Sequence, residues 1–103
     1  MDFDQFISGI CKENFNTYKF DDNHLKYVDV LSTQDEYEGL MIRFYEDGDI
    51  DVFMKNCMND YSILLNDASM FPSWEVMAEK TQGYDGYEQA INAMFVLLEL
   101  RYV

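Results

Sequence analysis

The densest group of reactive side chains lies in the middle of the chain, where seven carboxylates fall within seventeen residues and Arg43 is the only base. These acids are Asp35, Glu36, Glu38, Glu46, Asp47, Asp49 and Asp51. Grouped carboxylates can act as general acids and bases, hold a divalent cation, or bind a positively charged partner. Each of these uses requires different surroundings, so the neighbouring sequence helps to decide among them.

Acid–base catalysis needs a pocket that shifts the pKa values of the carboxyl groups. The acids here fall mostly in predicted turns and polar connections. His24 is the only histidine, no spacing pairs it with a cysteine nucleophile, and the five glycines are scattered rather than grouped in a phosphate-binding loop. We therefore predict that the chain is not an enzyme and has no catalytic residues. A concave pocket lined by carboxylates with shifted pKa values would argue for the reverse.

A calcium-binding loop is superficially suggested by EDGDID at 46–51. An EF-hand places acids at alternate positions before its glycine, and counting back from Gly48 these positions hold Asp47, Tyr45 and Arg43. A cation in the ligand shell excludes the motif. The sequence also contains no zinc motif of paired cysteines and histidines. We therefore predict no metal site and no cofactor.

Binding of a basic partner is the chemistry that the composition favours. Twenty acids against seven bases give a formal charge of −13, while 49% hydrophobic and 17% aromatic residues predict a folded domain rather than a disordered acidic tail. A folded chain this acidic repels itself, which we interpret as a sign of a basic protein partner. Direct binding to nucleic acid or to an anionic membrane is disfavoured by the same charge.

The spacing of the acids indicates what kind of surface the partner would have. Asp49 and Asp51 alternate on one predicted strand, about 6.8 Å apart at the usual strand rise, and phosphates along one DNA strand advance about 3.4 Å each. Alternate carboxylates could thus replace every second phosphate in the groove of a nucleic-acid-binding enzyme. The predicted partner-binding residues are the acids and two tyrosines suited to anchor an interface, namely Asp35, Glu36, Tyr37, Glu38, Tyr45, Glu46, Asp47, Asp49 and Asp51.

A β-hairpin over 40–54 must position these acids. A three-residue loop at 46–48 with a left-handed Gly48 places the apolar side chains of both strands on one face. The predicted pairs are Phe44 with Ile50, Ile42 with Val52, Leu40 with Met54, Met41 with Phe53, and Arg43 with Asp51. The last pair sets opposite charges directly across the strands. A two-residue turn would mix apolar and charged residues on both faces.

The flanking segments complete a single globular domain, residues 1–103, of the α+β class. The predicted elements are a helix over 2–15, a short strand at 18–20, a strand over 25–31, a helix within 56–70, a helix or edge strand at 73–80, and a helix over 87–101. They combine into an N-terminal helix, a small antiparallel β-meander of three to four strands, and two to three C-terminal helices packed on one sheet face.

The last helix introduces the alternative of self-association. Asp85 and Glu88 have the spacing of a capping box at its start. Its apolar residues, from Ala90 to Leu98, form a stripe wider than a surface helix normally needs. The helix is therefore either deeply buried or in contact with another chain. A homodimer through this helix, in a non-catalytic accessory subunit, is the corresponding alternative function.

In composition, size and predicted order of elements, the chain resembles the small acidic phage inhibitors of bacterial defence, which include anti-CRISPR proteins and DNA mimics. It also resembles the acidic immunity proteins that neutralise nuclease toxins. The resemblance is to these classes and assigns no role to any single residue. It implies inhibition by occupation of the basic nucleic-acid site of a target protein. The alternative is that the charge only solvates the surface.

The expected location is the cytoplasm of a bacterial cell or phage-infected host. The N-terminal residues MDFDQF carry two acids and no base, unlike a secretory signal. The two cysteines, Cys11 and Cys57, are consistent with a reducing compartment. We expect both to be buried structural thiols.

Overall fold

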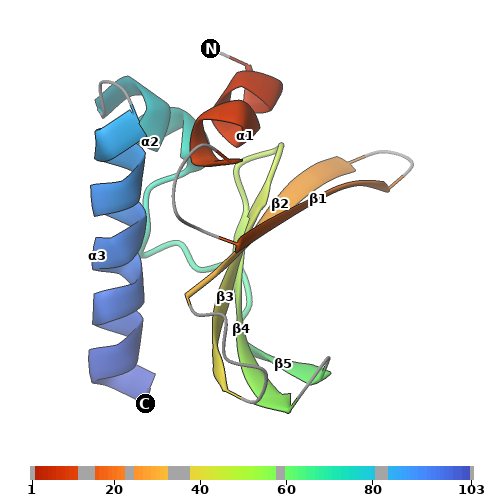
Figure 1. Cartoon of the computed structure of the whole chain (residues 1–103), viewed down its shortest axis with the longest axis vertical. Helices are drawn as coiled ribbons and strands as arrows, with labels where there is room; N and C mark the ends of the chain where they lie inside the picture. Colours follow the sequence, from red (N-terminus) through yellow and green to blue (C-terminus); the bar gives the residue numbers. More distant parts are fainter. Residues whose placement is uncertain are drawn as a thin grey trace.

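The computed structural model describes residues 2–11, 16–22, 25–32, 38–57, 60–80 and 84–102. Its elements are α1 (Phe3–Cys11), β1 (Asn16–Asp22), β2 (Leu25–Leu31), β3 (Gly39–Tyr45), β4 (Ile50–Cys57), β5 (Asp60–Leu65), α2 (Trp74–Lys80) and α3 (Tyr84–Tyr102). The strands form one antiparallel sheet in the order β1-β2-β3-β4-β5, and Figure 1 shows the helices on one side of it. The predicted α+β architecture is confirmed.

The segment at 56–70 differs from its prediction, because it contains the strand β5 instead of a helix. The prediction relied on apolar residues such as Tyr61 and Leu65, which are four positions apart. A spacing of four suits one face of a helix, but it also suits one face of a strand, whose period is two. Pairing with β4 decides the outcome, and the sheet accordingly gains β5 at its edge.

The hairpin of β3 and β4 has the predicted register, with Phe44 opposite Ile50 and Arg43 opposite Asp51. Its loop is closed by a hydrogen bond from the Gly48 amide to the Tyr45 carbonyl, 3.0 Å long. Gly48 has a backbone φ of 102°, a conformation that residues with a side chain rarely adopt. The three-residue loop is therefore confirmed.

The core lies between the sheet and the helices, and Phe6 of α1 is at its centre. The Phe6 ring is fully buried and lies 5.6 Å from the Phe44 ring of β3, 5.6 Å from the Trp74 ring of α2 and 5.4 Å from the Tyr87 ring of α3. The Phe6 side chain thus packs against the sheet and against both of the other helices. Gly9 of α1 allows the close approach of α3, because a Cβ atom there would lie 2.7 Å from the Tyr87 ring.

The segment at 73–80, for which sequence left two alternatives, contains the helix α2. The Ser73 hydroxyl accepts a hydrogen bond of 3.3 Å from the Val76 amide, as an N-cap does. The indole nitrogen of the buried Trp74 donates to the Glu46 carbonyl at 2.9 Å. The first turn of α2 therefore fixes the loop of the β3–β4 hairpin.

The helix α3 begins at Tyr84, earlier than the predicted start at Tyr87, so Asp85 lies within the helix and not at its cap. Ile91, Met94 and Leu98 are buried against the core. The described parts of the chain include no helix that is both long enough and apolar enough to cross a membrane.

Cys57 was predicted to be buried, but its side chain is exposed at the end of β4. The side chain of Cys11 lies outside the described part of the structure.

Candidate acidic interface

The structure separates the predicted partner-binding residues into two groups. Glu38 is exposed and precedes β3, whereas the other described members lie at or beyond the far end of that strand. The intervening seven residues span roughly 23 Å at the usual strand rise, so Glu38 is not part of the same cluster. Asp35, Glu36 and Tyr37 lie outside the described residues.

The second group lies at the β3–β4 loop, beside a cavity of about 350 Å³. Tyr45, Asp49 and Asp51 line it from the hairpin, and Asn66 and Asp67 line it from the segment after β5. Asp47 adds a further exposed carboxylate in the loop. We call Asp47, Asp49, Asp51 and Asp67 the aspartate cluster.

Asp51 is the structural member of the aspartate cluster. Its carboxylate accepts a hydrogen bond of 2.8 Å from the Tyr45 hydroxyl and one of 3.0 Å from the Asp67 amide. Burial, and then the bond to Asp51, raise the pKa of Tyr45, so its hydroxyl keeps the proton that it donates. Asp51 therefore ties the hairpin to the segment after β5.

Asp49 is the exposed member with the least favourable surroundings. Repulsion by Asp47 is the main cause that raises the pKa of Asp49, and the charges of Asp67 and Asp51 add to it. Among the described residues, no base lies within ion-pair distance of any member of the cluster. The cluster therefore holds a like-charge repulsion that a cation would relieve.

Arg43, the base within the acidic segment, forms its ion pair outside the aspartate cluster. It lies opposite Asp51 as predicted, but its guanidinium binds Asp29 on the other neighbouring strand, with Nε–Oδ1 at 2.6 Å and Nη2–Oδ2 at 3.0 Å. The carbon of the guanidinium lies 4.4 Å from the Tyr27 ring and 4.8 Å from the Phe53 ring. The bond to Asp29 is the main cause that raises the pKa of Arg43. The predicted position of Asp51 across from Arg43 is thus confirmed, but the ion pair of Arg43 is formed with Asp29.

The backbone of the loop is held on several sides. The Glu46 amide donates to the Lys26 carbonyl of β2 at 2.9 Å, and the Glu46 carbonyl accepts from Trp74. The Ala68 amide donates to the Ile50 carbonyl at 2.7 Å, beside the second wall of the cavity. These bonds hold the backbone that carries the aspartate cluster in one conformation.

Asp67 and Asn66 were missed because their segment was assigned to a helix. Asp67 has a φ of 56°, in the left-handed region where aspartate and asparagine are enriched. The polar pair between Leu65 and Ala68 is typical of a turn, so this signal was present in the sequence. Within the described residues, no three histidine, cysteine or carboxylate side chains are placed to hold a metal ion.

Comparisons with protein-family models, with curated proteins and with solved structures find no match for the chain.

Proposed function

We propose that the chain is a small acidic protein inhibitor that binds the basic nucleic-acid site of a target protein through the aspartate cluster. It acts in the cytoplasm of a bacterial cell or phage-infected host, as an anti-defence inhibitor of the anti-CRISPR or DNA-mimic type. An immunity protein that neutralises a nuclease toxin would use the same surface. The proposal is supported by one observation above all, the position of Asp49, Asp51 and Asp67 around one cavity beside the exposed Asp47, with no ion pair to a base among the described residues.

The cavity suits the head group of a partner's arginine or lysine. The Asp49 and Asp67 side chains can accept hydrogen bonds from a guanidinium, a charge-assisted geometry that is stronger than a neutral bond. Tyr45 offers an aromatic ring in the same wall, which can attract a cation. Binding would also remove the repulsion that raises the pKa of Asp49. This supports association with a site rich in arginine and lysine.

The same cavity has one feature that was expected of an enzyme, a carboxylate with a shifted pKa. The cause of the shift favours binding over catalysis. Asp49 is exposed, and repulsion by Asp47 raises its pKa more than burial does. A general acid is normally set in a water-excluded pocket that holds it against the substrate. We therefore propose a binding role and assign no catalytic residue.

The proposal is tested by capture from bacterial lysate at about 50 mM salt, followed by elution in a salt gradient and mass spectrometry. The wild-type chain should recover a basic nucleic-acid-binding protein that elutes as salt rises, because exposed charges are screened. A nuclease toxin among the recovered proteins would favour the immunity alternative, and a defence effector would favour the anti-defence one.

Two double variants separate the cluster from net charge. Asp49→Asn with Asp67→Asn should reduce the affinity for the recovered protein tenfold or more, while asparagine keeps the left-handed turn at 67 accessible. The control, Asp60→Asn with Glu79→Gln, removes the same two charges from exposed sites on β5 and α2. Equal losses of affinity in both variants would contradict a specific role for the cluster.

A further inference from the structure

Another cavity, away from the aspartate cluster, is lined mainly by apolar side chains. Met70 and Phe71 line it from the segment before α2, and five residues between Leu97 and Tyr102 line it from the end of α3. Its volume is about 420 Å³, within the range of roughly 300–1,000 Å³ that is usual for small-molecule sites. We call this cavity the apolar groove.

The apolar groove has a buried floor and exposed walls. Phe71 and Leu98 are buried and belong to the hydrophobic core, so they form a fixed floor. Met70, Leu97 and Leu100 are 50% exposed or more. A bound apolar molecule would remove this surface from water, which is favourable in proportion to the area that it covers.

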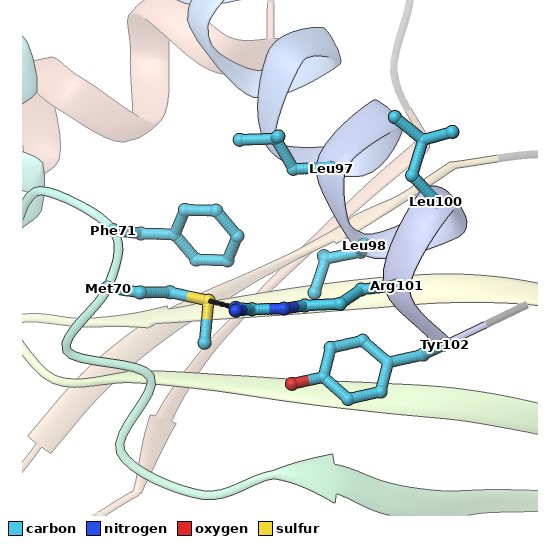
Figure 2. A pocket seen from close by; sticks show the side chains of 7 residues that line it. All are labelled: Met70, Phe71, Leu97, Leu98, Leu100, Arg101 and Tyr102. Carbon is cyan, nitrogen blue, oxygen red and sulfur yellow. Dashed lines mark hydrogen bonds between the residues drawn. The ribbon is translucent and has the colours of Figure 1, made fainter.

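Arg101 adds a positive charge to the apolar groove. Figure 2 shows its side chain extended across the groove, with the guanidinium and the Tyr102 hydroxyl both directed toward Met70. The guanidinium donates to the Met70 sulfur at 3.7 Å, and a thioether sulfur is a weak acceptor. Among the described residues, no carboxylate forms an ion pair with Arg101 and none lines the groove, although the chain has twenty acids.

The charge and the apolar lining together define a class of ligand. A guanidinium binds a carboxylate through two parallel hydrogen bonds, which are stronger than bonds between neutral groups. A cationic ligand would find no carboxylate in the lining, and a wholly apolar ligand would offer the guanidinium no acceptor. The net charge of −13 acts mostly over longer distances, where charges are screened beyond about 8 Å at physiological salt.

We propose that the apolar groove binds a small amphiphilic carboxylate, such as a medium-chain fatty acid. The carboxylate accepts hydrogen bonds from the Arg101 guanidinium and the Tyr102 hydroxyl, and the hydrocarbon chain lies against Phe71 and Leu98. This site and the aspartate cluster share no residue and bind opposite charges. The proposal therefore does not depend on the proposed function.

The alternative is that Arg101 only covers apolar surface with the aliphatic part of its side chain, as long basic side chains often do. This alternative predicts no preference for an anionic ligand. Octanoate and octanol distinguish the two cases, because their hydrocarbon chains are similar and only octanoate carries a negative charge at about pH 7.

An NMR titration of the isotope-labelled full chain with each compound tests the proposal. Octanoate should shift the amide signals of residues 70–71 and 97–102, with a Kd of about 1 mM or lower. Octanol should bind at least about fivefold more weakly, because it lacks the charged acceptor. No shift with octanoate at about 3 mM, shifts confined to other segments, or equal affinity for the two compounds would overturn the proposal.

A pair of variants tests the role of the guanidinium. Arg101→Gln should lower the affinity for octanoate to that for octanol. Lys80→Gln removes the same charge from an exposed site at the end of α2, outside the apolar groove, and should leave the affinity for octanoate unchanged. Equal losses in both variants would show that net charge alone attracts octanoate, which would contradict the proposal.

A second pair tests the place of the hydrocarbon chain. Leu97 lines the apolar groove, whereas the neighbouring Val96 does not, and the two are 57% and 54% exposed. Leu97→Ala should weaken the binding of both compounds several-fold, and Val96→Ala should leave it unchanged. A loss with Val96→Ala as large as that with Leu97→Ala would place the ligand elsewhere on α3. Circular dichroism on each variant checks that the fold is kept.

Discussion

Asp49 and Asp51 are two residues apart and yet have different roles. Asp51 accepts hydrogen bonds from Tyr45 and from the Asp67 amide, so its removal would loosen the loop. The Asp49 carboxylate is exposed, and its surroundings are mainly other negative charges. Substitution of Asp49 therefore changes charge with little structural loss, whereas substitution of Asp51 changes both.

We predict that Asp49→Asn stabilises the fold at neutral pH and low salt while it weakens partner binding. The folded-state pKa of Asp49 is raised above the ordinary value of 3.8, so the folded state holds this proton more tightly than the unfolded state does. The contribution of the Asp49 carboxyl group to the free energy of unfolding therefore falls as pH rises from about 4 through the folded-state pKa. Urea unfolding of both proteins at pH 3 and pH 7 measures the difference.

The gain in free energy of unfolding from Asp49→Asn should be near zero at pH 3, where Asp49 is protonated in both the folded and the unfolded state. At pH 7 the gain should be present. It should shrink as salt rises, because exposed charges are screened. An advantage of equal size at both pH values would show that repulsion is not its cause.

The partner of Arg43 shows what single residues do not reveal. The hairpin register correctly predicts Asp51 across from Arg43, but Asp29 lies across from it on the other neighbouring strand. Asp29 comes into reach through the register between β2 and β3, which was not predicted from the sequence. The choice then follows from burial, because Asp29 is 4% exposed and needs a countercharge.

At the scale of elements, prediction succeeded where two independent signals agreed. For the β3–β4 hairpin, the alternation of apolar residues and the glycine turn specify the same register. For β5 only a spacing of four was available, and it fits a helix and a strand equally well. The cavity was not predicted because Asn66 and Asp67, which form one of its walls, fell within the segment that was assigned to a helix.

The ion pair between β2 and β3 should be among the stronger polar contributions to stability. We predict that Asp29→Asn lowers the free energy of unfolding by about 3 kcal/mol, because it leaves a partly buried guanidinium without its countercharge. Asp4→Asn, which removes the exposed pair of Asp4 with Lys26, should cost less than about 1 kcal/mol. Urea denaturation measures both, and equal costs would contradict a structural role for Asp29.

At the scale of the whole molecule, the three-helix layer and the sheet together present two unlike surfaces. The loop that bears the aspartate cluster is fixed to α2 through Trp74, whereas the exposed apolar side chains of Val96, Leu97 and Leu100 belong to α3. Composition alone predicted an acidic partner-binding protein and an unusually apolar last helix. It could not divide the charge between structural and free carboxylates, since this depends on contacts between distant segments.

The most direct test of the central claim is a displacement measurement on the purified protein recovered by capture. Labelled nucleic acid is bound to that protein, and release is followed by fluorescence anisotropy as the wild-type chain or the Asp49→Asn, Asp67→Asn variant is added. We predict full release by the wild type, and a requirement for at least tenfold more of the variant. A wild-type chain that binds the target while the nucleic acid stays bound would contradict the claim.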